Sequence, residues 1–124
     1  MTATADAFLG NWFPSQMLER ADERVTPFRA DLLELDPHGL AGCLAAVRDA
    51  DMRRTIGLIT APTLVIAGAQ DKVTLPQHGQ LIAATIPGAQ LVTLPAVHLS
   101  NVECPDEFLK ELFTFVDDAG PHAD

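Results

Sequence analysis

Hydrophobic and polar positions divide the chain into two zones with different periods. Residues 1–60 carry apolar side chains at helical spacing, whereas residues 61–118 alternate between continuous apolar runs and helical stripes. We expect the first zone to be a set of helices separated by prolines and charged breaks, and residues 119–124 to be a tail. The expected helices of the first zone cover residues 14–20, 22–35, 39–50 and 52–59.

The second zone predicts the order strand, helix, strand, helix. Residues 63–67 form an uninterrupted apolar run, which is typical of a strand covered on both faces. A second strand is expected over residues 90–94, and helices over 76–86 and 105–118. Two strands joined by a helix run parallel. The predicted fold class is therefore α/β, with a helical segment followed by two parallel strands and two helices.

The small number of strands indicates an unfinished sheet. A parallel pair standing alone would leave long unpaired edges and would lack helices on one side. Either another chain supplies the missing strands, or the chain is a fragment of a larger fold.

Charge and cysteine content exclude several classes of protein. The 124 residues include 8 Lys and Arg against 17 Asp and Glu, a net charge of −9, so we expect no nucleic-acid partner. We find no apolar stretch typical of a membrane span and no pattern of a secretory signal, which favours a cytoplasmic protein without a membrane partner. Two cysteines, Cys43 and Cys104, cannot make a disulfide framework.

Two titratable residues follow the ends of the two expected strands. Asp71 comes after the first strand and His98 after the second. Ligands collect at the carboxyl ends of strands in open α/β sheets, and adjacent strands lie about 4.8 Å apart, so these loops can bring a carboxylate onto an imidazole. Such a pair is the orienting half of a Ser-His-Asp relay. The alternative is that Asp71 caps the next helix and His98 lies on the surface.

Several stretches resemble a known family. Residues 62–71, 86–89 and 98–108 are similar to the C-terminal part of α/β-hydrolases. Upstream, Gly10-Asn11-Trp12-Phe13, the break at residues 36–39 and residues 41–51 resemble the cap of 3-oxoadipate enol-lactonases, which are hydrolases of the β-ketoadipate route of aromatic catabolism. The resemblance covers nearly the whole chain, from about residue 8 to residue 116.

The resemblance implies a catalytic role for the pair at the strand ends. Asp71 would be the acid and His98 the base of a triad that hydrolyses 3-oxoadipate enol-lactone to 3-oxoadipate, and residues 1–60 would form the cap. The family also needs a serine on a G-x-S-x-G turn. This sequence has only Ser15 and Ser100, and neither has glycines at that spacing. We therefore expect the isolated chain to be inactive. The candidate protein partners are a companion chain that supplies the nucleophile portion and, through self-association, a second copy of this chain.

Other residues have a functional and a purely structural interpretation. Arg48 is our candidate to pair with the carboxylate of the lactone, or else an exposed helix charge. Trp12 lines the acyl pocket, or else fastens the cap to the core. Asp51 is expected to cap the helix that starts at residue 52, Ser100-x-x-Glu103 to form a capping box that holds the His98 loop, and Cys43 to be buried on an apolar helix face. Histidine spacing gives no zinc pattern, and no cofactor is implied.

Two other functions stay open at this point. The chain could belong to another esterase or to a perhydrolase of the same fold, since the superfamily motifs alone do not fix the substrate. It could also be a non-catalytic association domain that pairs through the strand edge at residues 63–67.

Overall fold

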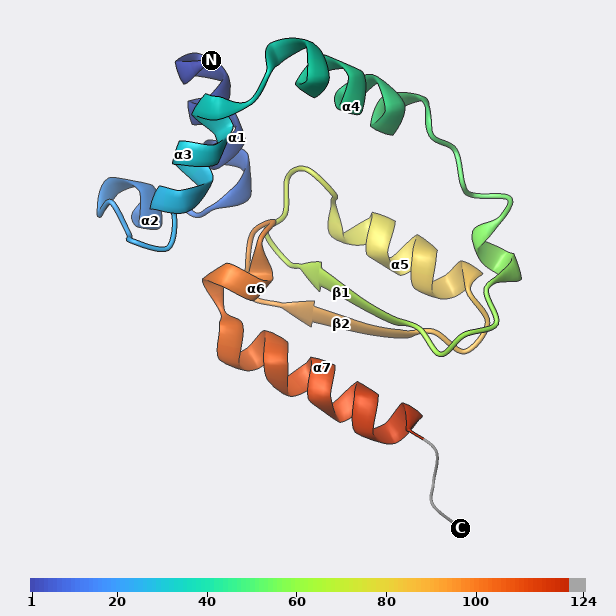
Figure 1. Cartoon of the computed structure of the whole chain (residues 1–124). Coiled ribbons are helices and arrows are strands. Elements are labelled where there is room, and N and C mark those ends of the chain that lie inside the picture. Colours follow the sequence, from blue (N-terminus) through green and yellow to red (C-terminus); the bar gives the residue numbers. More distant parts are fainter. Residues whose placement is uncertain (121–124) are drawn as a thin grey trace.

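The computed structural model describes residues 1–120, which form a helical segment (residues 1–60) and an α/β segment (residues 61–118) (Figure 1). Residues 121–124 of the predicted tail lie outside the described residues. In chain order the elements are α1 (Thr2–Trp12), α2 (Ser15–Glu19), α3 (Thr26–Glu34), α4 (Pro37–Asp49), the 3-10 helix η1 (Ile56–Leu58), β1 (Leu64–Gly68), α5 (Pro76–Thr85), β2 (Gln90–Leu94), α6 (Ser100–Glu103) and α7 (Pro105–Ala119).

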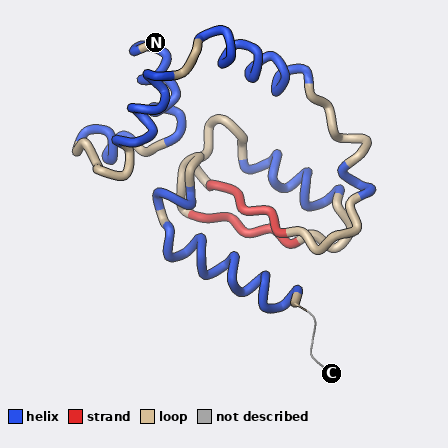
Figure 2. Tube along the Cα trace, in the orientation of Figure 1, coloured by secondary structure: helices blue, strands red, loops and turns tan. Residues whose placement is uncertain are grey.

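The α/β segment is built on one parallel strand pair (Figure 2). Leu64 lies opposite Gln90 and Gly68 opposite Leu94, so both strands end at the same level. Helix α5 connects the strands and packs on one face of the pair, while α7 packs against β2 from the other side (Figure 1). The parallel order predicted from the sequence is therefore confirmed, and it places the loops that follow β1 and β2 side by side.

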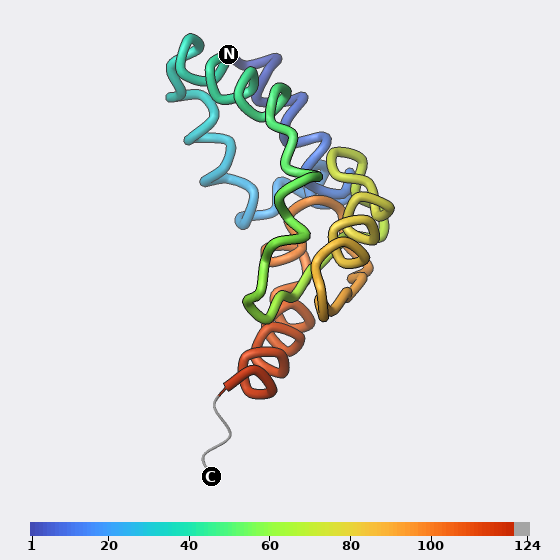
Figure 3. The backbone as a smooth tube through the Cα atoms, turned by 90° about the vertical axis from the view of Figure 1, so that its right-hand side faces the viewer, coloured from blue at the N-terminus to red at the C-terminus, as the bar shows by residue number. Residues whose placement is uncertain are grey.

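A small hydrophobic core holds the first three helices together. It consists of Ala5, Leu9, Phe13, Met17, Val25 and Leu32, and Phe13 is the largest side chain that is fully buried. The ring of Phe13 meets that of Phe28 edge-on, with their centroids 5.4 Å apart. Figure 3 shows this helical segment at one end of the molecule and α7 at the other. None of the helices between residues 2 and 119 combines the length and apolar character that a bilayer crossing requires.

Helix α4 differs from the sequence expectation. Its N-terminus is capped as expected for an Asp-Pro break, since the Asp36 carboxylate accepts the N–H of Gly39 at 2.7 Å. However, α4 buries none of its residues, and Leu44 and Val47 of its apolar face are exposed. The prediction that Cys43 is buried was wrong, because no other element of residues 1–120 packs on this face.

Three other local predictions differ from the structure. The sequence pattern does not indicate α1 as a separate helix, and it predicts the next long helix from residue 22, whereas α3 begins at Thr26. The expected helix over residues 52–59 is only the short η1. Asp51 therefore caps no α-helix; its carboxylate accepts the backbone N–H of Arg53 at 3.1 Å.

The molecule exposes more surface than a finished domain of its mass. Its accessible area is 8576 Å², whereas size scaling gives about 6,500 Å² for a compact monomer of this mass. Neither strand is fully covered, and large apolar side chains on α4, α5 and α7 face outward. The expectation of strands buried on both faces is therefore not met within this chain, because β1 and β2 form the entire sheet of the described residues.

Candidate active site

The candidate site lies where the two strands end. The loop after β1 carries Asp71, and the loop after β2 carries His98. Backbone hydrogen bonds fasten these loops to each other: the N–H of Ala69 donates to the carbonyl of Leu94 at 2.8 Å, and the N–H of Gln70 donates to that of Ala96 at 3.0 Å. The pairing of the two strands thus continues into the loops and fixes the position of one loop relative to the other.

The two loops bring a carboxylate onto an imidazole. Nδ1 of His98 lies 2.8 Å from Oδ2 of Asp71. The Asp71 side chain is 5% exposed and that of His98 is 25% exposed, so the pair is shielded on the carboxylate side and open on the ring side. The contact expected from the strand ends is therefore present.

Asp71 is held in its ionised form by its surroundings. Oδ1 accepts the N–H groups of Val73 at 2.7 Å and Thr74 at 3.0 Å, while Oδ2 also accepts the hydroxyl of Thr74 at 2.7 Å. Burial raises the pKa of Asp71, but hydrogen bonds from His98, Thr74 and Val73 more than offset it, and the pKa lies below its usual value.

The ionised carboxylate determines the tautomer of His98. Because Asp71 has only acceptors to offer, Nδ1 of His98 must carry the proton in their hydrogen bond. The other ring nitrogen, Nε2, is then left with a lone pair whenever the ring is neutral. This arrangement is suited to a general base that takes a proton at Nε2.

Gly68 makes the close approach of the loops possible. A Cβ built at this position would overlap the carbonyl oxygen of Val97 and would lie 2.7 Å from that of Ala96. Both contacts are with backbone, which cannot move aside without shifting His98. A glycine is thus required at the end of β1 for the second loop to cross over it.

Glu103 holds the His98 loop, although not as a capping box. Its carboxylate accepts the N–H of Val97 at 2.7 Å, next to His98. The predicted role of Ser100 in that box was wrong: Leu99 occupies the N-cap of α6, and the Ser100 side chain makes no capping bond there. The prediction that residues 100–103 hold the His98 loop is met by the hydrogen bond from Val97 to Glu103, without a contribution from the Ser100 side chain.

The helical segment also contacts the His98 loop. The carbonyl oxygen of Trp12, at the end of α1, accepts the N–H groups of His98 at 3.2 Å and Leu99 at 3.4 Å. A carbonyl in the last turn of a helix has no partner within the helix, and these two N–H groups supply one. The Trp12 ring is partly buried beside that of Phe8, with centroids 5.1 Å apart.

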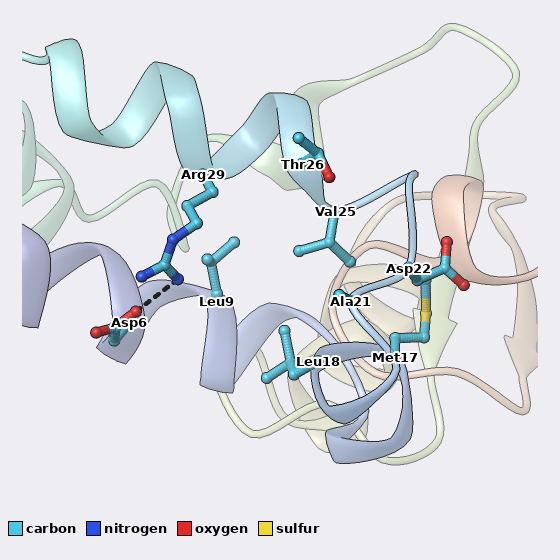
Figure 4. A pocket seen from close by; sticks show the side chains of 9 residues that line it. All are labelled: Asp6, Leu9, Met17, Leu18, Ala21, Asp22, Val25, Thr26 and Arg29. Atoms are coloured by element: carbon cyan, nitrogen blue, oxygen red, sulfur yellow. Dashed lines mark ion pairs between the residues drawn. The ribbon is translucent and has the colours of Figure 1, made fainter.

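Two cavities among residues 1–120 lie near the predicted site residues or within the helical segment. One, of about 210 Å³, lies beside Asp71 and His98 and is also lined by residues of β1, Thr74, His78 and Ser100; we call it the dyad cavity. The other, of about 370 Å³, lies among α1, α2 and α3 (Figure 4). Its wall is mostly apolar, and the ion pair between Arg29 and Asp6 lies on one side of it. The two cavities share no lining residue.

The structure does not bring all predicted site residues together. Trp12 and Arg48 line neither cavity. The Arg48 guanidinium is 73% exposed and forms a fork with its neighbour Asp49, at 2.7 and 2.9 Å. Roles for Trp12 and Arg48 in substrate binding remain predictions.

Two further residues belong to the site: the sequence does not single out Thr74, and it indicates only a solvated residue at His78. Thr74 bonds Asp71 through both its N–H and its hydroxyl, and His78 lines the dyad cavity. The spacing Asp-x-x-Thr before a proline is a turn signal that could have indicated Thr74. Within residues 1–120 no group of three or more metal-ligating side chains exists that could hold a metal ion.

Known proteins similar to this chain are hydrolases. No protein-family model matches it. It is 38% identical over 108 residues to 3-oxoadipate enol-lactonase 2 of Acinetobacter baylyi, a match that covers 87% of this chain and 40% of the relative. Among solved structures, a hydrolase from Pseudomonas aeruginosa PA01 superposes with a TM-score of 0.90 at 59% identity, covering 94% of this chain and 44% of that one.

A second solved structure is the enol-lactonase from Burkholderia xenovorans LB400, with a TM-score of 0.89 and 36% identity over 94% of this chain and 45% of that protein. The chain therefore spans less than half the length of the relatives it matches.

Proposed function

We propose that this chain supplies the acid and the base for the hydrolysis of a lactone. The chain belongs to the α/β-hydrolases and forms a C-terminal portion of that fold. The observation that carries the proposal is the 2.8 Å contact between Asp71 and His98 at the ends of adjacent parallel strands. The substrate we propose is 3-oxoadipate enol-lactone, since the curated relatives that match most of the chain are 3-oxoadipate enol-lactonases.

The proposed reaction uses His98 twice. A serine hydroxyl attacks the lactone carbonyl while Nε2 of His98 takes the hydroxyl proton. Collapse of the tetrahedral intermediate breaks the ring ester bond, and the ring oxygen leaves with that proton as an enol, which tautomerises to the ketone. His98 then takes a proton from water, which attacks the acyl-serine. The acyl–serine bond breaks as Nε2 returns the proton to the serine oxygen, and 3-oxoadipate is released. Asp71 keeps Nδ1 protonated and stabilises the imidazolium in both steps.

The serine of this scheme is not encoded in the chain. Ser100 lies near His98 in sequence, but it is the first residue of the short helix α6 and has no flanking glycines. No hydrogen bond joins its hydroxyl to the His98 ring in the part of the chain that the structure describes. We therefore propose that the nucleophile comes from an N-terminal portion of the same fold that lies outside these 124 residues.

The surface of the molecule supports the docking of such a portion. The accessible area exceeds the expectation for a compact monomer by about 2,000 Å², which is the scale of a permanent interface. The dyad cavity lies along β1, so that a strand paired to β1 would cover it and bring its own loop toward His98. The strand that extends the sheet beyond β1 would then also complete the site around His98.

Reconstitution tests the proposal. The chain is co-expressed with the N-terminal portion of the P. aeruginosa hydrolase, which is 59% identical to this chain over their shared region. We expect a complex that hydrolyses 3-oxoadipate enol-lactone, and loss of at least about a thousandfold in kcat with His98→Gln. The chain alone should show no turnover.

Other results would contradict the proposal. Turnover by the chain alone that is lost in His98→Ala would place the nucleophile within these residues. A complex that cleaves simple esters but not the lactone would favour another esterase. A stable, inactive oligomer of this chain that excludes the N-terminal portion would favour a non-catalytic association domain.

A further inference from the structure

Arg24 connects the helical segment to the element that follows His98. It lies in the turn between α2 and α3, where its guanidinium forms a fork with Asp22: Nε donates to Oδ1 at 2.9 Å and Nη2 to Oδ2 at 2.8 Å. The remaining nitrogen, Nη1, donates to the carbonyl oxygens of Val102 at 3.1 Å and Glu103 at 3.3 Å. One side chain therefore holds the turn and the end of α6 together.

The carbonyls that Arg24 binds belong to the helix that carries Glu103. Carbonyls at a helix C-terminus lack partners within the helix, and a cation there is favourable. The same Glu103 accepts the N–H of Val97 through its carboxylate, at 2.7 Å. A short path of hydrogen bonds thus runs from Arg24 through Glu103 to the residue before His98.

The chain contains a second copy of the local fork without the long-range contact. Asp51 and Arg53 have the same spacing as Asp22 and Arg24, and the same bonds: Nε to Oδ1 at 2.8 Å and Nη2 to Oδ2 at 2.6 Å. Arg53 makes no bond to another element within residues 1–120. The fork is therefore a local feature of Asp-x-Arg turns, whereas the bonds from Nη1 to α6 are particular to Arg24.

The ion pair keeps this guanidinium in one orientation. Hydrogen bonds from the side chain and backbone of Arg24 lower the pKa of Asp22 to about 2, so the carboxylate is charged at any working pH. With two nitrogens fixed by Asp22, the direction of Nη1 is set by the turn. The Nη1 group of Arg24 therefore points toward the C-terminal carbonyls of α6 in a fixed direction.

We propose that Arg24 is a positioning residue for His98, which fixes α6 and, through Glu103, the backbone that carries the imidazole against Asp71. The proposal rests on the proposed function only in assigning His98 as the base. Its structural content, that the His98–Asp71 contact depends on Arg24, can be measured without substrate.

The experiment observes the Nδ1–H proton of His98 by NMR in the ¹⁵N-labelled full chain. The resonance is assigned by its absence in His98→Gln. We expect Arg24→Gln to abolish it through exchange with water, because the ring no longer stays on Asp71. The matched control, Arg53→Gln, removes an equivalent fork and should leave the resonance intact.

A second control separates positioning from stability. Leu32→Val weakens the core of the helical segment, against which Val102 of α6 also packs, but removes none of the hydrogen bonds made by α6, so we expect a lower melting temperature with the His98 resonance retained. Arg24→Lys keeps the charge but cannot hold Asp22 and both carbonyls at once, and we expect it to weaken the resonance. An unchanged resonance in Arg24→Gln and Arg24→Lys, or its equal loss in Arg53→Gln or Leu32→Val, would overturn the proposal.

Discussion

Gly68 sets how closely the two loops of the candidate site can approach each other. Any side chain there would meet the carbonyls of Ala96 and Val97, which lie two residues and one residue before His98. The position of the imidazole therefore depends on a residue with no functional group of its own.

We expect Gly68→Ala to destabilise the chain by about 1–3 kcal/mol, because backbone must shift to admit the methyl group. The His98–Asp71 hydrogen bond should be lost with it. Urea unfolding and the NMR signal of the His98 ring measure the two effects.

Gly10→Ala is the control for this substitution. A Cβ at Gly10 meets nothing within 4 Å, and the residue lies inside α1. There we expect a gain of about 0.5–1 kcal/mol from helix propensity. A stabilising effect at Gly68 as well would show that the loops can part without cost.

Asp71 makes stability depend on pH in a defined direction. Burial raises its pKa, but its hydrogen bonds more than offset this, so the pKa in the folded chain lies below the usual value. The unfolded state then binds the proton more tightly. The carboxylate therefore stabilises the fold above the unfolded pKa of about 4, and this contribution is lost as pH falls through the folded pKa.

We expect the difference in unfolding free energy between the chain and Asp71→Asn to be largest above about pH 5 and to shrink below about pH 4. Urea titrations at a series of pH values measure it. A difference that grows on acidification would contradict the assignment of the ionised form.

The two cysteines are expected to differ in reactivity. Burial raises the pKa of the Cys104 thiol, the charges of Glu107 and Glu103 add to this effect, and its sulfur donates to the carbonyl of Ser100 at 3.3 Å. Cys43 is exposed. Iodoacetamide at pH 8 should label Cys43 at least about tenfold faster in the folded chain, with similar rates in denaturant. Mass spectrometry of the two peptides measures both rates.

At the residue scale, residues that follow strand ends could be predicted from the sequence, whereas contacts between residues far apart in the chain could not. Asp71 and His98 could be found because each directly follows a strand that is recognisable from its own residues. The contacts of Arg24 with α6 join residues 78 and 79 positions apart, and no local pattern specifies such a pairing. Cys43 was predicted to be buried, but α4 buries none of its residues in the described part of the chain.

At the scale of elements, α1 is the connection between the helical segment and the site. Its last carbonyl binds the His98 loop, and Phe13, directly after it, fills the core against Phe28. Its sequence is rich in small and polar residues, so its pattern is weak; tertiary packing defines it more than propensity does. The strands and α5 and α7, in contrast, were predicted to within about two residues at each end, because Pro and Gly punctuate them.

We expect Phe13→Ala to cost about 3–5 kcal/mol, because it empties the largest fully buried site of the helical segment. Loosening α1 should also raise hydrogen exchange at the N–H groups of His98 and Leu99. Val47→Ala, on the exposed face of α4, is expected to change stability by less than about 0.5 kcal/mol. Protection at His98 that survives in Phe13→Ala would mean that the α1 contact is dispensable.

At the scale of the whole molecule, the exposed apolar surface governs behaviour in solution. Leu109, Phe113 and Val116 share one stripe of α7, and Phe113 is 59% exposed. Contiguous apolar surface of this kind promotes association.

We expect the purified chain to self-associate, and Phe113→Glu to lower its weight-average mass in sedimentation velocity. Lys110→Gln, which makes the same change in net charge on a polar position of α7, should not. An equal effect of both variants would assign the association to charge instead of to apolar contact.

The acid and the base also lie close in sequence: Asp71 and His98 are separated by 27 residues, within one strand–helix–strand unit. Closing a loop of that length has a modest entropic cost, which grows only slowly with length. The His98–Asp71 contact can therefore form early, from local chain alone. Under the proposed function, the portion of the fold that carries the serine would meet a proton acceptor already in position and would need to supply only a hydroxyl.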